Sequence, residues 1–178
     1  MTRVLVTGFE PFGTHDANPS GLLAEALGGV VLPVSYARAG AALRDAIAER
    51  DPELVICFGL ADGDQAISIE RFALNLDDAG AVDNDGVRSS DVIDAAGPVA
   101  YRSTLPVDAT VAALREQGIP ANASRDAGGY LCNHVFYSLM GTLPPGARGG
   151  FVHVPLFDVL PLETQIRAAE TIIAVASS

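Results

Sequence analysis

The sequence predicts an α/β fold, in which residues 1–178 form a single-domain, three-layer α/β/α sandwich around a mixed, mostly parallel, twisted sheet. Short apolar runs alternate with longer segments of helical periodicity along the chain, which is the pattern of repeated strand and helix units. The run at 54–58 is apolar at every position, as expected for a strand buried on both faces of a parallel sheet. The 178 residues suffice for one well-buried core and are few for two.

Each element of the first half has a local signal. Val4-Leu5-Val6 is an apolar run that ends at Thr7-Gly8, and the cap-like Asn18-Pro19-Ser20 precedes the first helix. Asp51-Pro52 stops the next, Ala-rich amphipathic helix. The elements expected here are a strand at 4–6, a helix at 21–27, a strand at 30–34 and a helix at 39–50.

The second half continues the alternation. The segment at 67–74 alternates apolar and polar residues like a half-buried strand, and Gly118 ends a helical pattern. The elements expected here are strands at 54–58, 67–74 and 151–154 and helices at 107–117, 132–140 and 162–176.

The stretch from about 76 to 106 has weak periodicity and many turn-forming residues, including Asp83-Asn84-Asp85-Gly86. A loop of this length inside a compact domain is usually functional or mobile. Two interpretations remain open: a solvated acidic excursion, or a functional segment, either a flap beside the active site or a surface for subunit contact.

The charge balance bears on the class of partner. The chain has 22 acidic and 11 basic residues, a net charge of −11, which opposes binding to phosphate backbones and anionic membranes. We therefore expect no nucleic-acid or membrane partner. No apolar run approaches the roughly 20 residues that span a bilayer, and the first residues lack the length of a secretory signal, so the sequence predicts a cytoplasmic protein.

The two cysteines have different settings. Cys57 lies inside the apolar run at 54–58 and is expected in the core, because free cysteine is among the most buried residue types. Cys132 follows a Gly128-Gly129 entry and is expected about one turn into a helix, where the helix dipole and a nearby imidazolium lower a thiol pKa. His153, in a short apolar run, and Glu70, in another, supply the remaining parts of a Glu-His-Cys triad.

Four motifs occur along the chain in a fixed order. They are Thr7-Gly-Phe-Glu-Pro-Phe-Gly13 with Asn18-Pro-Ser20, Glu70-Arg-x-Ala-x-Asn75, Ser124-x-Asp-Ala-Gly-x-Tyr-Leu-Cys132-Asn133, and Gly150-Phe-Val-His-Val-Pro155. Any one of them is a weak signal, whereas four in register are specific. From residue 4 to about 176 the chain resembles the pyroglutamyl-peptidase I family of cysteine peptidases, also called pyrrolidone-carboxylate peptidases.

The resemblance implies an α/β/α sandwich that removes an N-terminal pyroglutamyl residue from peptides, without a cofactor, as a cytoplasmic homo-oligomer (dimer or tetramer). It makes Cys132 the nucleophile, His153 the general base and Glu70 the group that orients the imidazole. Phe9 and Phe12 are expected to sandwich the lactam ring, the backbone near Leu60 and Ala61 to read its amide, and Asn18 to support the site.

Alternatives to this hypothesis are a non-catalytic or weakly active relative that binds a lactam or a peptide N-terminus, and a thiol redox sensor. Asp64 and Gly80 stand where many bacterial members of the family carry arginine, which bears on rate and affinity. His134, two residues after Cys132, should project away from it, and His15 lies in an expected loop. The three histidines lack metal-ligand spacing, so no metal site is expected.

Overall fold

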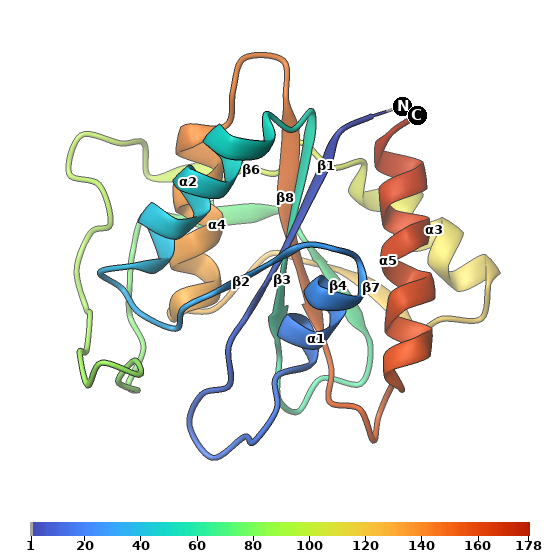
Figure 1. The fold of residues 1–178 in the computed structure, drawn as a ribbon, viewed down its shortest axis with the longest axis horizontal. Coiled ribbons are helices and arrows are strands. Elements are labelled where there is room, and N and C mark those ends of the chain that lie inside the picture. Colours follow the sequence, from blue (N-terminus) through green and yellow to red (C-terminus); the bar gives the residue numbers. More distant parts are fainter. Residues whose placement is uncertain (1) are drawn as a thin grey trace.

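The computed structural model describes residues 2–178, which form one six-stranded sheet, a separate two-stranded sheet and flanking helices (Figure 1). The strands are β1 Val4–Phe9, β2 Val30–Leu32, β3 Leu54–Leu60, β4 Ile67–Glu70, β5 Phe72–Leu74, β6 Ala100–Arg102, β7 Ala121–Ser124 and β8 Arg148–Val154. The helices are α1 Pro19–Ala26, α2 Ala39–Arg50, α3 Val107–Glu116, α4 Leu131–Thr142 and α5 Leu162–Ala176. None of the helices within this range is long and apolar enough to cross a membrane.

The large sheet is mixed, with strand order β2-β1-β3-β8-β4-β7. Strands β2, β1, β3 and β8 run parallel, β4 runs antiparallel to β8, and β7 is parallel to β4. The prediction of an α/β protein with a mixed, mostly parallel sheet is thereby confirmed.

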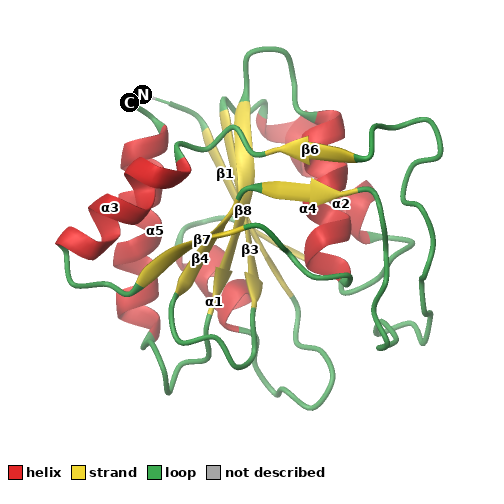
Figure 2. Cartoon of the chain, turned by 180° about the vertical axis from the view of Figure 1, so that it is seen from behind, coloured by secondary structure: helices red, strands yellow, loops and turns green. Residues whose placement is uncertain are grey.

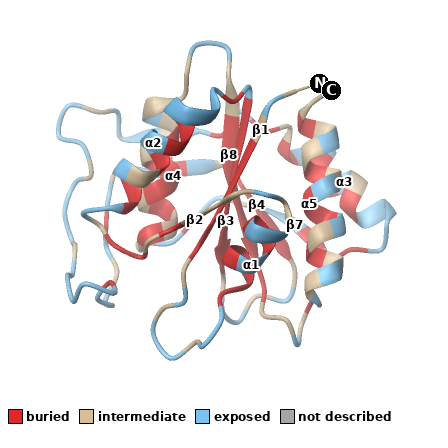
Figure 3. Cartoon of the chain, viewed as in Figure 1, coloured by how far each residue is buried: buried red, intermediate tan, exposed pale blue. Residues whose placement is uncertain are grey.

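Helices cover both faces of this sheet because its central strands are apolar on both faces. In β3 all seven residues are buried; Leu54, Ile56 and Phe58 pack in one core, and Val55 and Cys57 in the other. Helices α1, α3 and α5 contribute to the first core and α2 and α4 to the second, and the two helix layers flank the sheet with their buried sides inward (Figure 3).

The single strand predicted at 67–74 is wrong. It breaks at Arg71 into β4, which belongs to the large sheet, and β5, which pairs antiparallel with β6 in the small sheet (Figure 2). All four residues of β4 are buried, including Ser68 and Glu70, whereas in β5 only Ala73 is buried and Phe72 and Leu74 are exposed. The alternating pattern therefore predicted neither the burial of Ser68 and Glu70 nor the change of pairing partner at Arg71.

Strands β6 and β7 have no counterpart in the sequence prediction. Each is short: β6 has the sequence AYR and the edge strand β7 has the sequence ANAS, in which only Ala121 is buried. Neither strand therefore contains an apolar run. The boundaries of the other elements differ from prediction by a few residues. Helix α4 begins at Leu131, one residue before the expected start at 132, so Cys132 is its second residue and does not lie one turn inside.

Candidate active site

Cys132 is held at the start of α4 by glycines on both sides of it. Gly128 has a φ of +79°, and a Cβ on Gly129 would lie 2.6 Å from the backbone of Asp78, so the entry to the helix requires residues without side chains. On the opposite side, a Cβ on Gly59 of β3 would lie 2.6 Å from Cys132 Sγ. The thiol therefore packs directly over the end of β3, facing the sheet.

The start of α4 also presents backbone donors. The first intrahelical hydrogen bond runs from His134 N to Tyr130 O, so the N–H groups of residues 131–133 are not used by the helix itself. Tyr130 occupies the cap position in an extended conformation and provides no side-chain cap. These N–H groups, close to the thiol, are suited to hold a developing negative charge.

His153 and Glu70 are brought together by the antiparallel pairing of β8 and β4, in which Ser68 is opposite His153. Glu70 Oε1 lies 2.8 Å from His153 Nδ1, and the two residues are 1% and 7% exposed. A buried carboxylate is tolerated when it is paired, and this pairing fixes which imidazole nitrogen is left to face the pocket.

The pKa of His153 is set by opposing effects. Burial lowers it, but the negative charges of the Cys132 thiolate and the Glu70 carboxylate outweigh burial and raise the pKa to about 10. The imidazole is therefore protonated at neutral pH.

Cys132 and His153 line a mostly apolar pocket of about 160 Å³. Phe9, Phe12, Asn18 and Leu60 line the same pocket, so four of the five expected substrate-binding residues gather there. The remaining walls are Val34, Ala127, Tyr130 and Leu131, which sequence reasoning did not identify. Ala127, Tyr130 and Leu131 lie inside the quoted motif around Cys132, and that position was the one signal available for them.

Ala61 and Asn18 have specific local partners. Ala61 lines the groove next to the pocket; its N–H donates to Val154 O at 3.0 Å, and its carbonyl accepts from Asp64 N at 3.2 Å. Asn18 caps α1, because its Oδ1 accepts from Ser20 N at 3.0 Å, while its Nδ2 donates to Glu10 O at 3.1 Å. Asn18 thus holds the loop that carries Phe12.

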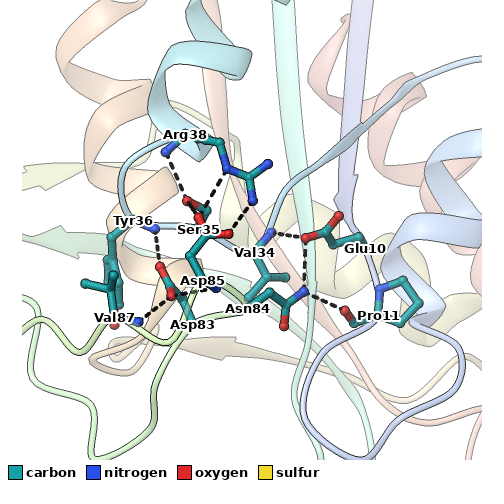
Figure 4. Close-up of polar contacts among 10 residues, drawn as sticks. All are labelled: Glu10, Pro11, Val34, Ser35, Tyr36, Arg38, Asp83, Asn84, Asp85 and Val87. Carbon is teal, nitrogen blue, oxygen red and sulfur yellow. Dashed lines mark hydrogen bonds and ion pairs between the residues drawn. The ribbon is translucent and has the colours of Figure 1, made fainter.

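The Val34 side of the pocket is fastened by the tip of the long loop (Figure 4). Asn84 N donates to Val34 O at 3.0 Å, and Asn84 Nδ2 donates to Glu10 Oε1 at 3.0 Å. Asp83 Oδ2 accepts from Tyr36 N at 2.9 Å. The Glu10 carboxylate also accepts from Val34 N and so is engaged away from the pocket.

The remaining candidates lie outside the pocket. His134 Nδ1 is 2.9 Å from Asp77 Oδ2, and His15 Nε2 is 3.3 Å from Asp62 Oδ2. Cys57 is fully buried, which raises its pKa to about 12, and neither cysteine is in a disulfide. Among residues 2–178 no group of three or more His, Cys, Asp or Glu side chains is arranged to hold a metal ion.

Comparison with known proteins places these features in a family. The family model described as pyroglutamyl peptidase matches residues 2–171. A pyrrolidone-carboxylate peptidase of Clavibacter michiganensis subsp. michiganensis is 49% identical over 169 residues, covering 87% of this chain and 79% of the relative. A Streptomyces coelicolor protein of the same name is 46% identical over 87% of this chain and 78% of its own length.

Solved structures of pyroglutamyl peptidases are also similar to this chain. The pyrrolidone carboxyl peptidase from Thermococcus litoralis is 37% identical and superposes with a TM-score of 0.95, covering 99% of this chain and 94% of that one. The pyroglutamyl peptidase I from Bacillus amyloliquefaciens is 34% identical with a TM-score of 0.93, covering 99% and 95%.

Proposed function

Since this chain belongs to the pyroglutamyl peptidase family and is an enzyme that removes N-terminal pyroglutamate, we propose that it does so by acyl transfer through Cys132, His153 and Glu70. The observation that carries the proposal is the 2.8 Å contact between His153 Nδ1 and Glu70 Oε1 in β8 and β4, with His153 and Cys132 lining one pocket. Nucleophile, base and orienting group are the parts that covalent catalysis by a thiol requires.

In the first half-reaction the Cys132 thiolate attacks the carbonyl carbon that joins the pyroglutamyl residue to the peptide. The carbonyl oxygen becomes an oxyanion, which the unused N–H groups at the start of α4 stabilise. The His153 imidazolium then gives a proton to the departing amine as the C–N bond breaks, leaving a pyroglutamyl thioester on Cys132.

In the second half-reaction a water molecule attacks the thioester. His153, now neutral, accepts a proton from this water, and the Cys132 thiolate leaves as pyroglutamate is released. Throughout, Glu70 holds Nδ1–H and so directs Nε2 towards the thiol and stabilises the imidazolium.

We propose that the pocket selects the lactam by shape and by lack of charge. Pyroglutamate is a small planar ring without an ammonium group, and Phe9, Phe12 and Leu60 provide mostly apolar walls for it. Asn18 holds the loop of Phe12, and the Leu60 and Ala61 backbone is the candidate partner of the ring amide.

The direct test uses a chromogenic pyroglutamyl anilide, with the corresponding free glutamyl anilide as control. We expect the purified protein to release the chromophore from the first and not from the second, because the glutamyl ammonium has no carboxylate partner lining the pocket. Binding of the pyroglutamyl anilide without release would instead identify a lactam-binding, non-catalytic relative.

We also propose that the protein is a homo-oligomer. Several apolar side chains between residues 74 and 99 are exposed, with Leu76 at 44% and Val99 at 85%, and neighbouring residues form an apolar groove there. Such a patch is typical of protein contact surfaces. Light scattering that reports a monomer at micromolar concentration would contradict this proposal.

A further inference from the structure

An open groove of about 520 Å³ adjoins the lactam pocket. The two cavities share Ala127 and His153, which form the boundary between them. The pocket is mostly apolar, whereas the groove is lined mainly by polar side chains and backbone from the ends of β4 and β7 and from the turn after β3. The groove is thus the continuation of the pocket on the far side of the catalytic imidazole.

The chemistry of the proposed function decides what occupies this groove. The leaving amine must come within hydrogen-bond reach of His153, which protonates it. The pyroglutamyl ring fills the pocket on one side of His153, so the residue after pyroglutamate extends to the other side. That residue therefore lies in the groove.

The groove is strongly acidic. Asp64 is half-buried and Asp126 is exposed on its lining, and no lysine or arginine lines it. Neither carboxylate has an ion-pair partner within residues 2–178. Hydrogen bonds to residues nearby in sequence hold both side chains: Asp64 Oδ2 accepts from Ser68 Oγ at 3.3 Å, and Asp126 Oδ1 accepts from Gly128 N at 2.9 Å.

Glu70 adds a second, independent feature. It also lines the groove, and its Oε2 is buried and has no hydrogen-bond donor among the described residues. Oε1 of the same carboxylate is bound to His153. The groove therefore offers a buried acceptor in addition to the two carboxylates at its rim, which matches an occupant rich in N–H donors.

Nearby cations leave the groove acidic. Arg71 is paired with Asp108 outside the groove, and Arg125, next to Asp126 in sequence, is exposed and does not line it. His15 is paired with Asp62.

We infer that Asp64 and Asp126 make this groove a binding site for a basic residue, lysine or arginine, directly after the pyroglutamate. This inference rests on the proposed function and adds to it the class of peptide that is cleaved best. The carboxylates are partly or fully solvated, so their effect is on the order of three- to tenfold in kcat/KM and weakens as salt is added.

The test compares pyroglutamyl-arginine amide with pyroglutamyl-citrulline amide, which is nearly isosteric and uncharged. Cleavage exposes an α-amine that a fluorogenic amine reagent detects, and neither intact substrate contains one. We expect arginine to be preferred about three- to tenfold at low ionic strength and the preference to shrink in 0.5 M NaCl. The double variant D64N/D126N should bring the ratio to about one.

The matched control is D45N/E49Q, which changes the net charge by the same amount on exposed positions of α2 and should keep the arginine preference. A ratio near one in the unaltered protein, or a preference that survives D64N/D126N, overturns the inference while citrulline turnover leaves the proposed function standing. Absence of turnover on both substrates and on the chromogenic anilide overturns the proposed function, and the inference with it.

Discussion

Replacing Gly59 by alanine tests how tightly the thiol and the imidazole are coupled through packing. A Cβ at this position would lie 2.6 Å from Cys132 Sγ and 2.7 Å from Cζ of Phe151. Both distances are well below the contact distance of about 3.5–4.0 Å between non-bonded heavy atoms. One added methyl therefore displaces the Cys132 thiol and the Phe151 ring.

The displacement reaches the His153 imidazole as well. The Phe151 ring packs against the His153 imidazole with centroids 5.0 Å apart, and against Phe136 at 5.8 Å. Because Phe151 is fully buried, it cannot move without moving these neighbours. We expect kcat to fall by about two orders of magnitude, the effect of roughly 1 Å of misplacement in a catalytic site.

The stability cost follows from overpacking a full core, which is about 1–3 kcal/mol. For a chain of this size, each kcal/mol corresponds to a fall in Tm of about 2–4 °C. The assay combines turnover of a pyroglutamyl anilide at saturation with a thermal melt followed by circular dichroism. Gly40→Ala is the matched control: it is a buried glycine in α2 whose added Cβ meets nothing closer than 3.4 Å, so activity and Tm should be retained.

A Gly59→Ala protein with normal kcat would refute this reasoning, since it would mean that the thiol and ring yield to the methyl without loss of alignment. A large loss of Tm with normal kcat would show that the packing of the core can be disturbed without loss of catalysis, and this result would also refute the reasoning. A loss of kcat in Gly40→Ala as well would show that the effect is not specific to the site.

The remaining predictions concern the groups of the site. Cys132→Ser should fold normally and lose nearly all turnover, because a hydroxyl is a far weaker nucleophile than a thiolate. An active Cys132→Ser protein would place the nucleophile elsewhere. Cys57→Ser should keep the pH optimum. Glu70→Gln removes one of the charges that raise the His153 pKa to about 10. The alkaline limb of the pH–kcat profile should therefore move to lower pH, and kcat should fall more than the affinity for substrate. An alkaline limb that does not move would show that Glu70 does not act on the imidazole. Phe12→Ala should raise KM for pyroglutamyl amides by losing about 1–3 kcal/mol of apolar contact, while the rate of Cys132 alkylation by a small reagent stays nearly constant; an unchanged KM would contradict the aromatic sandwich.

The same His153 pKa has a consequence for stability. A histidine whose pKa is raised on folding, from about 6.5 when unfolded to about 10, contributes stability that is fully present below pH 6.5. That contribution is lost as pH rises through 10. The free energy of unfolding, measured by denaturant titration, should therefore decline between neutral pH and pH 10 by less in Glu70→Gln than in the unaltered protein.

The elements that could be predicted from the sequence are those with a continuous or periodic pattern of apolar residues. Residues 54–58 could be identified as a buried strand because every side chain there faces a core, and the helices with an amphipathic stripe could be placed within a few residues. The sequence did not predict strands β6 and β7 or the break at Arg71. Strand pairing depends on partners far away in sequence, and an element of three or four residues is too short to show a periodic signal.

The site divides in the same way. Cys132, His153 and Glu70 lie in recognisable motifs, so their grouping could be proposed from the sequence. Val34 lies in no motif, and it lines the pocket only because the end of β2 passes beside Phe9 and β1. Asn133 lies in the Cys132 motif, but its bonds to the backbone of Leu74, which join β5 to α4, are a tertiary contact.

The long acidic loop shows why composition alone left two interpretations open. Asp83 is only 4% exposed; its Oδ1 accepts from the backbone N–H groups of Asp85 and Val87, and its Oδ2 from that of Tyr36. Asp85 is paired with Arg38. A carboxylate that caps buried N–H groups and one that faces water are identical in sequence, and only the approach of 34–38 distinguishes them. Because these bonds hold Tyr36 and, through Asn84, Val34 (Figure 4), the loop is not a solvated excursion at its tip: it sets the position of one wall of the pocket that Cys132 and His153 line.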